Sequence, residues 1–316
     1  MLAKELFNII GKSTKKYNII SVIPGDGKII THEDENVLEI GIPKRTYLSM
    51  FKQAHDTWQD MSGMNIDDIY YMTLGYLITT NEHHTILKLH RKVTFQLIQE
   101  RGWSVLAQEL QYITSILTCR MSRINKSSSL WHWLKMLTVL SVYINKSTST
   151  YELVIDRAIK SCELHFANYY GCNFLRWVIQ INRVIDVPVE FDDVLRKLVI
   201  SSCRTSLSDC GLWGVLQVYL STGDIEWTIN DLRRIVDSLR QEGLEFTSPV
   251  LQIRNTDHVA CAIEQLDWLI LVQCLVVTPY KSVVQAIPEK TVEEKLTNAS
   301  TKVRQLAQEI LTSKKN

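Results

Sequence analysis

The stretch NYYGCNFLRW, residues 168–177, is the clearest copy of a unit that recurs along the chain. A polar turn leads directly into a run of aromatic and aliphatic residues. Tyr169, Cys172 and Arg176 are spaced by three and four residues, so they share one face of a helix. Asn168 is a good N-cap, because its side-chain oxygen can accept a hydrogen bond from a free amide of the first turn. The stretch therefore predicts a helix that begins near Asn168.

Three weaker copies align on the position of Cys172, which they fill with Lys88, Trp131 and Trp213. The four positions are spaced by 43, 41 and 41 residues. A period near 40 with helical content on both sides is typical of an α-solenoid, in which each unit is a pair of helices. The sequence thus predicts an all-α fold, a TPR-like superhelix of helical hairpins that follows a short irregular segment.

The absence of proline and the spacing of apolar residues predict where the helices lie. Residues 44–187 contain no proline, and their 3.6-residue periodicity is typical of helices. We expect helices over 44–60, 66–80, 84–100, 104–122, 129–143, 150–165, 170–183, 191–204, 211–221 and 229–242. Further helices over 256–276 and 290–312 would cap the solenoid, since terminal repeats are atypical.

Residues 1–45 form the irregular N-terminal segment of this prediction. A short helix over 2–10 is followed by a β-like run over 17–23 and by short extended segments over 28–31 and 37–42. The turn GDGK at 25–28 lacks the spacing of a phosphate-binding loop and is interpreted as an ordinary turn. We therefore expect a boundary near residue 45, with the solenoid and its capping helices over 46–316.

Composition limits the classes of function. The chain has 35 basic and 34 acidic residues, a net charge of +1, which argues against a nucleic-acid or anionic membrane surface. Its seven cysteines include no Cys-x-x-Cys, which favours reduced, buried thiols in a cytosolic protein. The N-terminus does not read as a signal peptide, and the longest apolar run, around Trp268–Val277, is too short to span a bilayer. These features predict a cytoplasmic protein without a membrane span.

The four copies resemble the repeat of protein prenyltransferase α-subunits, Pro-x-Asn-Tyr-x-x-Trp-x-x-Arg followed by Arg or Gln and often Trp. The copy at 168–177 retains the Asn, the Tyr, the Arg and the final Trp, whereas no copy retains the Pro. The chain is most similar to a divergent branch, the prenyltransferase α-subunit repeat-containing proteins. It shares with them an Asn-x-x-x-Thr form at 81–85 and a Ser-Asp-x-x-Gly form at 208–211. The resemblance covers roughly residues 65–220.

This resemblance implies the α-type subunit of a heterodimeric protein prenyltransferase, of the geranylgeranyltransferase type III kind. The chain would hold no cofactor and would not be catalytic alone. It would wrap a zinc-bearing β-subunit of the Rab geranylgeranyltransferase type and help to bind diphosphate and protein substrate. The implied acceptors are proteins with a C-terminal Cys, SNAREs among them. The concave side of the helix row would be the interaction surface.

Lys126 and Tyr169 are the candidate catalytic residues under this resemblance. Lys126 stands five residues before Trp131, where the family's diphosphate-contacting lysine precedes its motif Trp. Tyr169 occupies the place of a family tyrosine that reaches toward the diphosphate. A cation there would stabilise the charge that develops on the leaving group. The alternatives are a solvated lysine in an inter-helix turn and a tyrosine that packs at the edge of its helix.

Arg91 and Arg176 occupy basic motif positions. A guanidinium can satisfy several carbonyl groups at once, so we expect both to bind turns of an adjacent repeat or of the partner. Trp131, Trp177 and Trp213 are expected to be core wedges between helices.

The histidines invite a metal interpretation that the spacing does not favour. His83, His84 and His90 lie close together with Glu82 beside them, but no fourth ligand is spaced for zinc. We therefore expect no metal in this chain.

Two functions remain open. A non-enzymatic helical-repeat scaffold for protein–protein interaction is the alternative to the prenyltransferase subunit. The losses at motif positions, Lys88 and Cys172 for Trp and Leu216 for Arg, favour the scaffold. The presence of both Lys126 and Tyr169 favours the enzyme subunit, particularly if both side chains point to one concave site.

Overall fold

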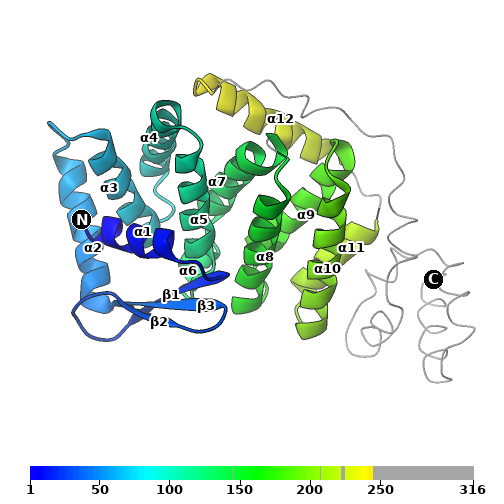
Figure 1. The fold of residues 1–316 in the computed structure, drawn as a ribbon, viewed down its shortest axis with the longest axis horizontal. Coiled ribbons are helices and arrows are strands. Elements are labelled where there is room, and N and C mark those ends of the chain that lie inside the picture. Colours follow the sequence, from blue (N-terminus) through cyan, green and yellow to red (C-terminus); the bar gives the residue numbers. More distant parts are fainter. Residues whose placement is uncertain (145, 207, 222–224, 245–316) are drawn as a thin grey trace, which may run out of the picture.

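A computed structural model describes residues 1–144, 146–206, 208–221 and 225–244 of the chain. The described part is mostly helical, with one three-stranded sheet near the N-terminus (Figure 1). The helices expected over 256–276 and 290–312 lie outside the described residues.

The N-terminal segment is a helix and a sheet, not an irregular stretch. Helix α1 (Leu2–Lys12) precedes strands β1 (Tyr17–Ile23), β2 (Ile30–Glu33) and β3 (Val37–Pro43). The central strand β3 pairs in parallel with β1 and antiparallel with β2. The apolar runs of β1 and β3 are long enough to pair over seven residues, which gives the segment its regular structure. Thr118 also donates to the carbonyl of Asn18 at 3.0 Å, so the sheet is bound to the helices.

The helices follow one another with short connections. They are α2 (Lys44–Gln59), α3 (Ile66–Thr79), α4 (His84–Arg101), α5 (Ser104–Leu117), α6 (Ser122–Asn125), α7 (Ser128–Thr138), a π-helical turn η1 (Val139–Ile144), α8 (Thr148–Leu164), α9 (Tyr169–Val184), α10 (Val189–Thr205), α11 (Cys210–Leu220) and α12 (Glu226–Gln241). Most of these bounds agree with the apolar period to within a few residues. The regions 104–122 and 129–143 differ, because α5 is followed by the separate short helix α6 and α7 continues as η1.

The helices form two layers. Helices α4, α7, α9 and α11, here called the motif helices, each begin at one of the four repeated turns. Within their layer α7 packs on α9 and α9 packs on α11, while in the other layer α5 packs on α8 and α8 packs on α10. Figure 1 shows α5, α8 and α10 side by side.

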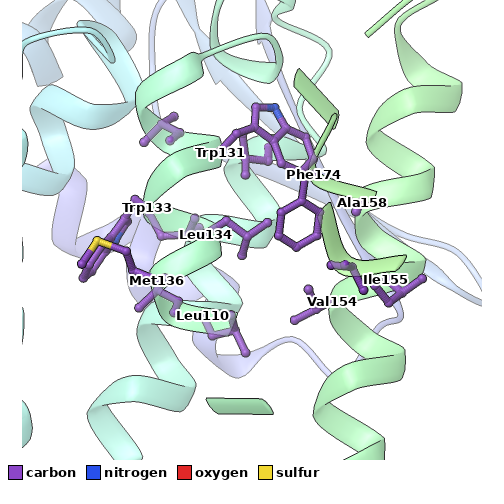
Figure 2. Close-up of a cluster of buried hydrophobic side chains, with 14 of the residues drawn as sticks. Leu110, Trp131, Trp133, Leu134, Met136, Val154, Ile155, Ala158 and Phe174 are labelled. Atoms are coloured by element: carbon purple, nitrogen blue, oxygen red, sulfur yellow. The ribbon is translucent and has the colours of Figure 1, made fainter. Parts of the chain in front are cut away.

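The main hydrophobic core runs through the described chain from Ala3 to Leu244, and a small second cluster joins Ala54, Met72, Tyr76 and Ile86. Trp131, Trp177 and Trp213 are all buried in the main core, as expected of wedges between helices. Figure 2 shows Trp131 against Phe174, where the two ring centroids are 5.5 Å apart. The tryptophans therefore hold adjacent motif helices together.

Helix α12 crosses the motif helices (Figure 1). Its Thr228 bonds to Gln180 of α9, and its Asp231 pairs with Lys135 of α7 at 2.9 Å. Farther along, Ser238 accepts a hydrogen bond from Arg91 of α4 at 3.0 Å. The helix thus crosses the C-terminal halves of α9 and α7, and its last turns reach Arg91 in the N-terminal half of α4.

Candidate functional site

The turns before the motif helices contact one another along one edge of the molecule. Asn168 caps α9 by accepting from the amide of Gly171 at 3.1 Å, and it donates to Oδ1 of Asn125 at 2.6 Å. Asp209 caps α11 and also accepts from the amide of Ala167 at 3.1 Å. Each turn is therefore bound to the next, which explains why amide and carboxylate side chains recur there.

Lys126 and Tyr169 both lie at this edge. The Nζ of Lys126 donates to the carbonyl of Phe166 at 3.0 Å, a bond between neighbouring turns. Tyr169 is 64% exposed and packs edge-on against Tyr170, with the ring centroids 5.4 Å apart. Lys126 thus makes the contact of a turn lysine, and Tyr169 extends from the surface.

An arginine binds the end of an adjacent helix, as expected, but in α9 this residue is Arg183 and not Arg176. Arg176 is half-buried beside Gly214 of the next motif helix. Arg183, which sequence reasoning did not single out, donates to the carbonyls of Val218 at 2.7 Å and of Tyr219 and Ser221. It thereby satisfies the last carbonyl groups of α11, the role expected of Arg176. The only signal in the sequence was its position, two turns beyond Arg176 on the same helix.

A pocket of about 600 Å³ lies between α4 and α7, and the end of α12 closes one side of it. His84, Lys88 and Arg91 of α4 are spaced by four and three positions, so they share one face of that helix. The lining residues are His84, Leu87, Lys88, Arg91, Ser128, Ser129, His132, Ser238 and Glu242. Most of these side chains carry polar groups, and more of them are basic than acidic.

Arg91 forms the floor of this pocket. Its guanidinium lies over the ring of Trp133, 5.8 Å from the centroid, and its Nη2 donates to Ser238. Its Nε is buried and has no hydrogen-bond partner among the described residues. Burial lowers the pKa of Arg91, and the carboxylate of Glu242 opposes that shift. The guanidinium remains charged because arginine ordinarily titrates far above neutral pH.

The first turn of α7, beside the pocket, already binds a negative group. Glu82, from the turn before α4, accepts from the hydroxyl of Ser127 at 2.5 Å, of Ser128 at 3.1 Å and of Ser129 at 2.6 Å. Burial alone would raise the pKa of Glu82, but these hydrogen bonds outweigh it and hold the pKa below its usual value. The N-terminus of a helix favours such a carboxylate.

Charge is unevenly distributed between the motif helices and the rest of the chain. The motif helices contain a single acidic residue, Glu100. Their basic residues are Lys88, Arg91, Lys92, Arg101, Lys135, Arg176 and Arg183. The whole chain has 35 basic and 34 acidic residues, so the motif helices are richer in basic residues than the chain as a whole, although Arg101 and Lys135 are paired with Asp67 and Asp231.

A buried polar network lies beneath the pocket. Glu109 accepts from Tyr70 at 2.5 Å, from Nε2 of His90 at 2.8 Å and from the indole of Trp133 at 2.8 Å. Nδ1 of His90 bonds to Thr73 at 2.8 Å. The network joins α3, α4, α5 and α7, and it places Trp133 where Arg91 can lie over it.

The histidines of the metal interpretation serve other purposes. His90 belongs to the buried network, and His83 caps α4 by accepting from the amide of Ile86 at 3.3 Å. Across the described ranges, no group of three or more His, Cys, Asp and Glu side chains could hold a metal ion. In the same ranges no helix is both long and apolar enough to cross a membrane.

Comparison with known proteins identifies related domains. Residues 1–118 match the ECM9 N-terminal domain, and residues 130–239 match the ECM9 middle domain. The chain is also 32% identical over 216 residues to Protein ECM9 of Saccharomyces cerevisiae, an alignment that covers 65% of this chain. It spans 55% of the length of that relative. The similarity therefore extends over both domains but not over the whole yeast protein.

These matches correct the family expected from the repeated motif. The matching models are those of ECM9 domains, and the name of the yeast relative indicates no prenylation, so the assignment as a prenyltransferase α-subunit was wrong. The zinc-bearing β-subunit and the C-terminal Cys and SNARE acceptors lose their support with it, whereas the roles of Lys126 and Tyr169 at a diphosphate stay predictions. The physical reason is that the shared residues cap helices and pack between them. Asn168 and Trp131 do what stacked helical hairpins require in general.

Proposed function

We propose that this chain is a helical-repeat scaffold that binds an acidic segment of a partner protein on the outer face of its motif helices. The observation that carries the proposal is the charge distribution, with seven basic residues and one acidic residue on four stacked helices. Electrostatic complementarity of this kind gives binding its specificity and its rate of association.

The stacking of the helices supports an α-solenoid as the framework. Consecutive helices pair, the turns before α7 and α9 are joined by Asn125 and Asn168, and Trp131 of α7 packs on Phe174 of α9. Gly171 and Gly211 allow the close approach: a Cβ on Gly211 would stand 2.9 Å from the Sγ of Cys172. Repeats of this kind present an extended surface made from the same position of each unit.

The part of the surface available to a partner is the part of the motif helices that α12 leaves open. Helix α12 occupies the C-terminal halves of α7 and α9, where Lys135 is already paired with Asp231, and it reaches Arg91 of α4. Lys88 and His132 remain exposed beside it, and Arg176 is half-exposed on α9. A short acidic protein segment suits this surface better than a nucleic acid does, because the surface has few exposed basic side chains and nucleic-acid binding requires contacts to many phosphates.

A fluorescence-anisotropy titration with a labelled peptide of alternating Glu and Ser tests the proposal. We expect binding that weakens with salt, because exposed charges are screened. The double substitution Lys88→Gln and Arg176→Gln should weaken it by about tenfold, the equivalent of about 1.4 kcal/mol.

The matched control removes two lysines elsewhere. Lys52 of α2 and Lys197 of α10 are both exposed and lie outside the motif helices. Lys52→Gln with Lys197→Gln should leave the affinity unchanged. Equal loss in both double variants would contradict the proposed surface, as would stronger binding of a single-stranded oligonucleotide than of the peptide.

A further inference from the structure

We propose that the pocket between α4, α7 and α12 binds a phosphate monoester, carried by a phosphorylated residue of the acidic segment. This inference rests on the proposed function and specifies the chemistry of its central contact. It concerns a cavity whose charged groups are only partly used within the chain.

Two cations of the pocket are available to a ligand. Lys88 is exposed and forms no ion pair in the described part of the chain. Arg91 also lines the pocket; its Nη2 donates to Ser238, and its buried Nε is enclosed by the protein, so a ligand would meet the outer part of the guanidinium. The two residues are three positions apart on α4, so their side chains emerge from the same face. A planar guanidinium beside an ammonium can contact two oxygens of one tetrahedral anion.

The remaining lining supplies further donors. His84 and His132 present imidazoles from α4 and α7. Ser128 and Ser129 donate their hydroxyl hydrogens to the carboxylate of Glu82, so the donors of the pocket for a ligand are those of α4 and His132. The acidic lining residue is Glu242, at the end of α12.

The number of donors favours phosphate over carboxylate. A phosphate monoester carries a charge of about −1.5 to −2 at neutral pH and three acceptor oxygens, whereas a carboxylate has two oxygens and one charge. The pocket volume of about 600 Å³ leaves room for the residue that bears the phosphate. Recognition of phosphorylated segments by arginine clusters is a general mode of peptide binding.

Isothermal titration calorimetry of the full chain with four probes tests this inference. Three are peptides of one acidic sequence that carry phosphoserine, serine or glutamate at the central position, and the fourth is inorganic phosphate. We expect the phosphoserine peptide to bind at least about tenfold more tightly than the serine peptide. Lys88→Gln should abolish most of that difference, and inorganic phosphate should bind weakly at the same site.

Two control variants separate the pocket from its surroundings. Lys92→Gln removes an exposed lysine from the same helix outside the pocket lining and should leave the phosphoserine preference intact. Lys197→Gln removes an exposed lysine of α10, outside the pocket lining, and should retain the preference as well. Thermal unfolding of each variant verifies that it is folded.

The outcomes separate the two proposals. Equal binding of all three peptides would overturn the phosphate inference and leave the acidic-segment scaffold in place. Failure of every peptide to bind would overturn the proposed function itself. Lys88-dependent binding of inorganic phosphate without a phosphoserine preference would overturn the phosphorylated partner and assign the pocket to a free phosphate compound.

Discussion

At the scale of single residues, the buried carboxylate of Glu109 depends most on its neighbours for its charge. Its side chain is completely buried and accepts hydrogen bonds from Tyr70, His90 and Trp133. Burial alone would raise the pKa of Glu109, but the charge of His90 and the three hydrogen bonds outweigh it and hold the pKa below its usual value. A buried charge persists only with such partners.

Glu109→Gln is expected to destabilise the protein by about 3–5 kcal/mol, the usual effect of breaking a buried charged pair from one side. Glutamine offers one acceptor oxygen where the network has three donors. Urea unfolding at neutral pH measures the loss. Glu152→Gln, at an exposed position of α8, is the matched control and should change the free energy of unfolding by less than about 0.5 kcal/mol.

The same network predicts a pH dependence with a definite sign. A carboxyl whose pKa is depressed in the folded state contributes stability above its unfolded pKa, about 4.3 for glutamate. That contribution is lost as the pH falls through the folded value. The difference in unfolding free energy between the wild type and Glu109→Gln should therefore shrink in acid. A difference that stays constant from neutral pH into acid would show that Glu109 is not ionised in the folded protein.

At the scale of elements, helix α12 determines how much of the motif-helix face is open. Its apolar residues Leu232, Ile235 and Leu239 are buried. Lys135 of α7 lies between the rings of Trp177 and Trp227, and it pairs with Asp231. Burial lowers the pKa of Lys135, and the charge and hydrogen bond of Asp231 oppose that shift. The pair therefore joins α12 to the helices below it.

Asp231→Ala should loosen α12 by about 3 kcal/mol, because it leaves a mostly buried ammonium without its carboxylate. Hydrogen exchange of the amides of Glu226–Gln241 measures this opening and should accelerate by about a hundredfold. Asp237→Ala removes an exposed acid from the same helix and should have little effect. Equal exchange in the two variants would mean that α12 is held by its apolar face alone.

The elements were far more predictable from the sequence than their arrangement. Apolar periodicity located α9 and α10 within two residues, since burial on one face fixes the spacing. The crossing of α12 could not be predicted, because the contact of Arg91 with Ser238 joins positions 147 residues apart. The same holds for the pocket, which needs α12 to close it. Lys88 departs from the Trp of the motif, and its side chain lines the pocket in which we propose that phosphate binds.

At the scale of the whole molecule, the two matched domains form one body. The hydrophobic core is continuous from Ala3 to Leu244. Arg157 of α8 is buried and donates to the carbonyl of Lys16 at 3.1 Å and to Thr114 of α5 at 2.8 Å. It lies in the part that matches the ECM9 middle domain, whereas its partners lie in the part that matches the N-terminal domain. Burial lowers the pKa of Arg157 to about 10, and the charge of Asp156 opposes that shift.

Arg157→Met should therefore destabilise both matched domains by the same amount. The substitution leaves buried oxygen acceptors without a donor, at a cost of about 2–4 kcal/mol. Because one core is shared, amides of β1 and of α9 should lose equal protection in hydrogen-exchange measurements. Arg45→Met, which removes an exposed pair with Asp26, should change either value by less than about 1 kcal/mol. Loss of protection in α9 alone would show that the two domains unfold independently, with Arg157 serving only its own domain.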